Sequence, residues 1–351
     1  MFRWYLICRD MIVMKKILFI TGCSIVLLFT ACTKELSDNF TVYANHPLND
    51  TVWVKNVSNT ASVHALFDLF VPGIIVDSFN VATGASLHYG DSLDIEFQPG
   101  SCIGTGTSGV PTGNARLEIV QLKRKGDFIK FFKPTTTDNA SVLVTGGGLF
   151  IRVLKDGKEL SLATGSTVKV RFSDVDTAKP NMQTFYGREG NPVPLKGIDT
   201  SYSWVRDYDT TALTTWAKTS NNPLVPSYFG YEMNSKNLRW MAAERYIDST
   251  QPRTKITAIL SPNFTNKNTA VFAVFANQKT VVNLHGDYPS RSFFANNIPL
   301  RTSIKLISLS YIGSDLYLGV KDISSVATVT SYTILPEKKS LKDILAFLDN
   351  L

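Results

Sequence analysis

The chain has 351 residues, four cysteines and a formal net charge of +7, to which residues 1–31 contribute +3. No long basic run follows those residues, which argues against nucleic acid as a partner. The length suggests two domains rather than one.

The first predicted element is a signal peptide. Lys15–Lys16 supply a positive head, residues 17–29 form an apolar middle, and small residues precede Cys32. The apolar middle is too short for a membrane span, which needs about 20 residues. We therefore expect residues 1–31 to be removed, and Met14, directly before the lysines, is a candidate for the true start of translation.

The sequence "FTAC", which ends at Cys32, resembles the lipobox of bacterial lipoproteins, with Phe29 where Leu is usual. In that family a peptidase cuts before a cysteine that carries lipid, so Cys32 is the predicted lipidation site. The sequence "ITGC", which ends at Cys23, also matches, but it would leave an apolar core of residues 17–20 only. One acyl chain anchors weakly, since each buried methylene contributes roughly 0.8 kcal/mol, and the resemblance implies several chains. An uncleaved anchor and an ordinary signal peptide remain the alternatives.

Residues 32–62 are predicted to form a polar tether and N-terminal segment, and residues 63–177 a β-sandwich domain. Apolar and polar residues alternate in this block, which is typical of half-buried strands. The alternating stretches are Ser92–Phe97, Ala115–Lys123, Leu149–Leu154 and Ser166–Phe172. Turn signals such as "PTGN", "TGGG" and "KDGKE" separate them, and strands at this spacing suggest a sandwich.

Alternation is lost in residues 178–235, which are rich in Pro, Asn and aromatic residues. We interpret this segment as an irregular connection with one short strand near residues 202–205. Trp204 and Trp216 are the candidates for rings that stack on a sugar or peptide ligand. Aromatic side chains also fill sandwich cores, so packing in a core or between domains is the alternative for both.

Residues 236–351 are predicted to form a second β-rich domain that ends in a helix. Ser340 can cap this helix, and Asp343 faces its positive end. Apolar residues fall on one face of the helix, namely Leu341, Ile344, Leu345 and Leu348. A helix of about 11 residues is marginal alone, so we expect it to dock on the sheet of the second domain.

No motif for catalysis or metal binding stands out. The histidines, His46, His64, His88 and His285, lack the spacing of a zinc site. "GTGTSG" (104–109) matches G-x-G-x-x-G, but a dinucleotide site requires that string to open a helix, and strand-like residues follow it. Cys102 has no local partner, and we expect a passive thiol. We predict no catalytic residue, no metal and no cofactor; a hydrolase with a site assembled from loops is the third hypothesis.

Two stretches resemble a β-sandwich module of lipoproteins and surface proteins from Bacteroidota, and more distantly a ZU-type sandwich. The matching glycine, turn and apolar positions are Gly113, Gly146, Gly147, Asp156, Gly157, Lys158 and Leu160. In the second block "NLRWMAAERY" is similar to a strand that follows such modules, and residues 296–319 resemble a recurring ending. The resemblance covers roughly residues 78–319 with gaps. It implies an all-β fold of two sandwich-like domains in a cell-envelope setting, and it transfers no catalytic residue.

These observations predict a lipid-anchored, non-enzymatic protein of the cell envelope, expected in the outer membrane. Its role would be binding or structural, toward a protein or glycan partner, with the membrane reached through the lipid on Cys32. A carbohydrate-binding lipoprotein of a glycan-uptake system is the second hypothesis, and it rests on the aromatic segment.

Overall fold

The computed structural model describes residues 49–70, 73–104, 109–174, 177–190, 198–219, 227–248 and 250–351. Strands dominate these residues, and the predicted all-β fold is confirmed. Three short helices accompany the strands in the described ranges: α2 (Ser62–Asp68), α3 (Lys125–Lys130) and α4 (Leu341–Asp349).

Two sheets form a sandwich in the described part of the chain. Sheet I has the strand order β1-β5-β6-β13-β9-β10, with β7 and β4 attached beside β6. Its strands are β1 (Ile75–Asn80), β4 (Cys102–Gly104), β5 (Asn114–Leu122), β6 (Leu143–Lys155), β7 (Lys158–Leu162), β9 (Gln183–Arg188), β10 (Ser203–Arg206) and β13 (Arg239–Tyr246). Sheet II has the order β11-β12-β8-β3-β2. Its strands are β2 (Ala85–His88), β3 (Leu93–Phe97), β8 (Val168–Ser173), β11 (Leu213–Lys218) and β12 (Tyr228–Ser235).

The alternation along each strand decides which side chains fill this sandwich. Leu93, Ile95 and Phe97 of β3 are buried between the sheets, in one cluster with the inward residues of β5. Asp94, which points to the other face, lies within hydrogen-bond distance of His88 on the neighbouring strand, with 2.7 Å between Oδ1 and Nδ1. The outer face of sheet II is therefore polar, as expected for an antiparallel sheet with one solvated side.

Sheet III has the order β20-β14-β17-β16-β15-β18-β19-β21, and only the β14–β20 pair among the described strands is parallel. Its strands are β14 (Arg253–Ile259), β15 (Thr269–Phe275), β16 (Val281–Asp287), β17 (Ser292–Pro299), β18 (Ile304–Ile312), β19 (Asp315–Ile323), β20 (Thr330–Thr333) and β21 (Glu337–Lys339). One face of the sheet encloses its own apolar core, which includes Ile256, Val271 and Leu306. The sheet therefore curls around one of its two faces.

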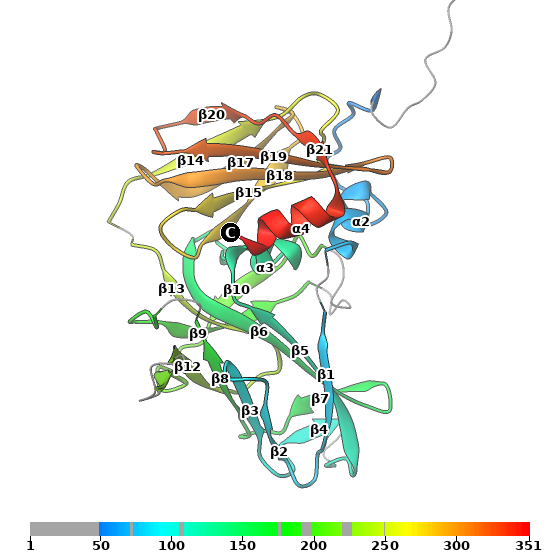
Figure 1. The fold of residues 1–351 in the computed structure, drawn as a ribbon, viewed down its shortest axis with the longest axis vertical. Helices are drawn as coiled ribbons and strands as arrows, with labels where there is room; N and C mark the ends of the chain where they lie inside the picture. The colour runs from blue at the N-terminus through cyan, green and yellow to red at the C-terminus, as the bar shows by residue number, and fades with distance from the viewer. Residues whose placement is uncertain are drawn as a thin grey trace, which may run out of the picture. The chain divides into compact units, whose positions relative to one another are not determined.

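The helices lie between sheet I and sheet III (Figure 1). One apolar cluster joins Phe67 of α2 and Phe128 of α3 to Trp240 of sheet I and Phe272 of sheet III. The expected separation into a domain before residue 178 and another after residue 235 is not what the structure shows. Strand β13 comes from the second predicted block but pairs with β6 and β9 in sheet I, and residues 47–351 form one compact unit.

Residues 178–235 also differ from the prediction of an irregular connection. They contain strands β9, β10, β11 and β12, of which only β10 was expected. Strand β9 completes sheet I beside β13, and β12 pairs with β8 along six residues of sheet II. Strands β9, β10 and β11 have four to six residues, and Gly230 and Ser235 stand at buried positions of the eight-residue β12 and interrupt its apolar alternation. Pairing with distant strands stabilises these segments.

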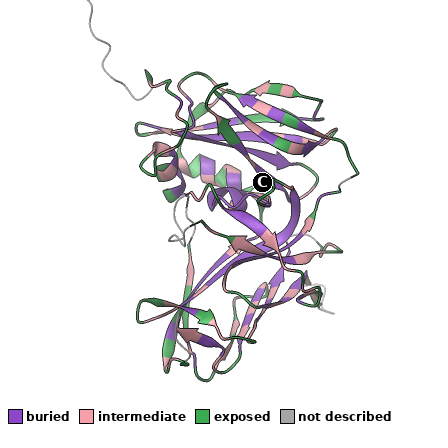
Figure 2. Ribbon diagram, turned by 180° about the vertical axis from the view of Figure 1, so that it is seen from behind, coloured by how far each residue is buried: buried purple, intermediate pink, exposed green. Residues whose placement is uncertain are grey.

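The C-terminal helix is capped as predicted. The Ser340 Oγ accepts a hydrogen bond from the backbone N–H of Asp343 at 3.1 Å. Ile344 and Leu348 are buried, and in Figure 2 the helix beside the C terminus carries both buried and exposed residues. The helix packs on α3 and on the cluster shared by sheets I and III, and so does not belong to sheet III alone.

Replacing Ser340 with alanine should lower the free energy of unfolding by about 1 kcal/mol, because the backbone N–H of Asp343 loses its acceptor. Urea denaturation followed by tryptophan fluorescence measures the change. Lys342→Ala is the matched control, because Lys342 is exposed on the same helix and should change stability by less than about 0.5 kcal/mol. An equal loss in both variants would show that the cap contributes nothing specific.

Candidate functional site

Two adjoining cavities lie beside strand β16. The first has a volume of about 430 Å³ and the second about 260 Å³. Phe132, Thr200, Asn283 and His285 line both cavities, so the two are parts of one depression, which we call the β16 groove. The larger cavity falls within the range of about 300–1,000 Å³ that is typical of small-molecule sites.

Strand β16 supplies one wall of the groove. Asn283 and His285 are two residues apart and therefore point to the same face of the strand. Val282 and Leu284 alternate with them and are buried in the core of sheet III, which fixes the strand in place. Because the apolar side chains of β16 face the core, the amide of Asn283 and the imidazole of His285 face the groove.

The N-terminal segment before α2 forms the opposite wall and is held on sheet III by specific contacts. The Asn266 side chain donates to the backbone oxygen of Val54 at 2.6 Å and accepts from its N–H at 3.2 Å. The buried ring of Trp53 lies 5.0 Å from that of Phe293, centroid to centroid. These contacts position Asn56, which is two residues after Val54.

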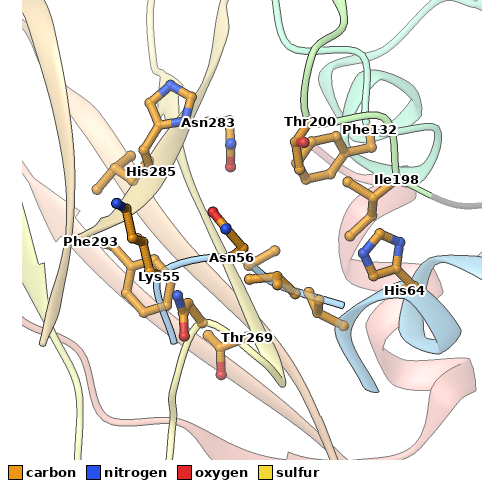
Figure 3. A pocket seen from close by; sticks show the side chains of 16 residues that line it. Lys55, Asn56, His64, Phe132, Ile198, Thr200, Thr269, Asn283, His285 and Phe293 are labelled. Carbon is orange, nitrogen blue, oxygen red and sulfur yellow. The ribbon is translucent and has the colours of Figure 1, made fainter. Parts of the chain in front are cut away.

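Helix α2 and the segment before β10 complete the groove. His64 projects from α2, and Figure 3 shows it on the side of the cavity opposite His285, with Asn56 and Asn283 between them. Thr200 lies in a turn in which the Asp199 carboxylate accepts hydrogen bonds from the N–H groups of Gly190 and Ser201, at 2.8 and 2.9 Å. The Asp199 carboxylate therefore stabilises this turn.

The polar side chains of the groove have unused hydrogen-bonding capacity. Several lining side chains form no hydrogen bond within the described residues: the half-buried His64 and Asn283, and the exposed Asn56, Thr200, His285 and Asn296. By contrast, two side chains of the same lining are bonded within the protein. Asn266 bonds to Val54, and Thr269 bonds to Asn268 and Ser310. The first group is thus available to a ligand, and the second is structural.

The groove carries little charge. Burial lowers the pKa of His64, which nearby Asp68 partly offsets, and partial burial lowers the pKa of His285. Both imidazoles are therefore neutral at pH 7. Among the described residues that line the larger cavity, the exposed Lys55 is the only one with a permanent charge.

Two carboxylates line the smaller cavity, and both already have partners. Asp138 forms a 3.0 Å ion pair with Arg188, and Asp199 holds the turn described above. No group of three or more potential metal-binding residues occurs in the described ranges. The free polar groups of the groove are amides, hydroxyls and neutral imidazoles.

The two tryptophans that the sequence singled out lie away from the groove and differ from each other. Trp204 is fully buried in the cluster between sheets I and III, so its ring offers no face to a ligand. Trp216 is half-buried on β11, opposite Gly230 of β12, and three residues from the inward-facing Leu213. It therefore lies on the outer face of sheet II. The sequence-based hypothesis of a stacking ring can apply only to Trp216.

Of the cysteines, Cys102 lies in the described part of the chain. Cys32, the predicted lipidation site, lies outside the described residues, as does Cys23. Cys102 is fully buried, and burial raises the pKa of its thiol to about 11. The thiolate is the reactive form, so these properties agree with the expected passive role. Residues 105–108 of the glycine-rich match also lie outside the described residues.

A buried lysine beside the groove carries no signal in the sequence. The Lys133 Nζ lies 4.1 Å from the ring centroid of Tyr202 and 5.1 Å from that of Trp240. Burial lowers the pKa of this ammonium to about 8. Lys133 does not line either cavity, and we interpret it as a cation packed on two rings of the core.

A scan against protein-family models and a search of curated proteins find no match to this chain. In the part of the chain that the structure describes, no helix is both long and apolar enough to cross a membrane.

Proposed function

We propose that this chain is a lipid-anchored protein of the cell envelope, in the outer membrane, that binds a ligand and performs no catalysis. Two features support the proposal. The sequence around Cys32 resembles a lipobox, and several acyl chains would hold the protein on a membrane. The folded unit that follows the tether contains a groove suited to a small molecule.

The observation that carries the binding role is the set of unpaired polar side chains in the β16 groove. Buried polar groups are usually hydrogen-bonded within the protein or to ordered water. The half-buried Asn283 has no partner among the described residues, and the exposed His285 and Asn56 beside it present their polar groups to the same cavity. A ligand that bonds to them would gain these interactions.

Metabolic labelling with radioactive palmitate tests the anchor. We expect the wild-type chain to take up label and to sediment with membranes in a bacterial host that processes lipoproteins. Cys32→Ala should lose the label and leave the membrane fraction, because no other thiol follows the signal until Cys102, which is buried. Cys23→Ala is the matched control and should keep the label.

Loss of label in Cys23→Ala with retention in Cys32→Ala would overturn the assignment of the lipidated residue. Label in neither the wild type nor the variants would overturn the anchor itself. Cleavage of a bound ligand by the purified protein would contradict the non-enzymatic part of the proposal.

A further inference from the structure

We propose that the β16 groove binds a neutral oligosaccharide, with consecutive sugar units in the larger and the smaller cavity. This inference rests on the proposed binding role and assigns the class of ligand. It is carried by the hydrogen-bonding groups of the groove, its lack of free charge and its two-part shape.

The hydrogen-bonding groups match hydroxyl groups in both directions. A sugar hydroxyl donates one hydrogen bond and accepts others. An asparagine amide and a neutral imidazole each offer a donor and an acceptor, and the Thr200 hydroxyl does both. Asn56, Asn283 and His285 have no partner among the described residues, so each can bond to a ligand without breaking an existing contact.

The charge of the groove disfavours ionic ligands. An anionic ligand would need buried cations, and the larger cavity has only the exposed Lys55. A cationic ligand would need free carboxylates, and both acids of the smaller cavity are engaged, Asp138 with Arg188 and Asp199 with its own turn. The lowered pKa values of His64 and His285 keep the imidazoles neutral, in agreement with an uncharged ligand.

The apolar part of the lining suits the C–H faces of sugar rings. Phe132, which is 5% exposed, lines both cavities, and the partly exposed Val57 and Ile198 line the larger one. Val57 and Ile198 therefore offer most of the apolar surface that a sugar ring could contact. Small-molecule sites combine an apolar lining with a few polar groups. In this groove the apolar lining would contact the faces of the sugar rings, and the polar groups would bond to their hydroxyl groups.

An array of neutral and acidic glycans, probed with the detergent-extracted full-length protein, tests the inference. We expect retention on neutral oligosaccharides and little on acidic ones. Calorimetry with the best neutral glycan should then show about tenfold weaker binding for Asn283→Leu and for Asn56→Leu, because each removes hydrogen bonds but preserves side-chain size. Asn56 is exposed, so its variant should fold normally even if Asn283→Leu does not.

Trp216→Ala is the matched control, because Trp216 lies on the outer face of sheet II and should not affect binding in the groove. Loss of binding in Trp216→Ala with unchanged binding in Asn56→Leu would move the site to sheet II and overturn the inference. No retention on any neutral glycan, or stronger retention on acidic ones, would overturn it too. Palmitate labelling is independent of these results, so a failed ligand assignment can be told from a failed anchor.

Discussion

Replacing Asp174 with asparagine should lower the free energy of unfolding by about 3–5 kcal/mol, because it removes a buried carboxylate that pairs with the buried ammonium of Lys279 and with Lys179. The Asp174 side chain is fully buried and forms an ion pair with Lys279, whose side chain is 4% exposed. Asp174 follows β8 of sheet II, and Lys279 lies in the turn between β15 and β16 of sheet III. The pair therefore ties the sandwich to the third sheet.

Lys279 is also held by backbone contacts, which make the loss of the Asp174 carboxylate difficult to compensate. The Lys279 Nζ donates to the backbone oxygen of Gly146 in β6 at 3.1 Å, and its own backbone oxygen accepts from Thr145 N–H at 2.9 Å. Removing the carboxylate takes an anion away from an ammonium group that these contacts hold in a buried position. The turn that leads into β16, and so into the groove, should loosen with it.

Urea denaturation measures this effect, and two variants control it. The double variant Asp174→Asn/Lys279→Met removes both charges and should recover most of the loss, since apolar replacement of a buried pair is often neutral. Asp322→Asn removes an exposed partner of Lys305 and should change stability by only about 0–1 kcal/mol. A loss for Asp174→Asn no larger than that for Asp322→Asn would contradict the role of the buried pair.

Replacing Glu244 with glutamine should make the protein more stable at neutral pH, by an amount that grows with pH. Glu244 lies on β13, is fully buried, and neither carboxyl oxygen has a hydrogen-bond partner among the described residues. Burial raises the pKa of this carboxyl well above its usual value. In the unfolded chain the same group ionises near pH 4.3.

The direction in which the free energy of unfolding changes with pH follows from the protons that the folded and unfolded states bind at Glu244. Above about pH 4.3 the folded protein retains a proton on Glu244 that the unfolded chain releases, so the free energy of unfolding falls by about 1.4 kcal/mol per pH unit. This decrease continues until the pH reaches the raised pKa of the folded state. The glutamine variant cannot ionise, so its stability relative to wild type should rise with the same slope.

Thermal and urea unfolding of both proteins between pH 4 and pH 8 measures the difference. Glu118→Gln is the matched control, because Glu118 is also buried in sheet I but is paired with Arg152 at 2.5 Å and Arg116 at 3.0 Å. That variant should be less stable than wild type at neutral pH. A constant difference between Glu244→Gln and wild type at every pH would show that Glu244 is not held protonated.

Much of the strand content could be predicted because alternation reports burial directly. The pattern of β3 identified Leu93, Ile95 and Phe97, and all three are buried as expected. The "TGGG" stretch was different, since it was interpreted as a turn but lies inside β6. A Cβ on Gly146 would lie 2.3 Å from the Tyr231 ring, and Gly147 adopts a φ of 138°, so these glycines serve packing and a bulge rather than a chain reversal.

The domain boundary could not be predicted because it depends on pairing between distant segments. The alternation in β13 correctly indicated a strand, but nothing in residues 239–246 specifies that β6 and β9 are its neighbours. The capped helix α4 could be predicted, since Ser340 and the apolar face that follows it are local signals. Local patterns identify elements, and the choice of partner lies in long-range contacts.

The groove could not be predicted for the same reason. Asn56, His64, Thr200 and His285 come from four separate segments and carry no common spacing. The histidines were considered only as zinc ligands, for which their spacing is wrong. The aromatic segment drew attention instead, and its most prominent ring, Trp204, is part of the core.

Intact-mass spectrometry of the protein extracted from membranes tests the central proposal most directly. We expect a mature chain that begins at Cys32 and carries added mass equal to a set of acyl chains on that residue. A chain that begins elsewhere, or one that begins at Cys32 without acyl groups, would contradict the assignment of this protein as a lipid-anchored binding protein.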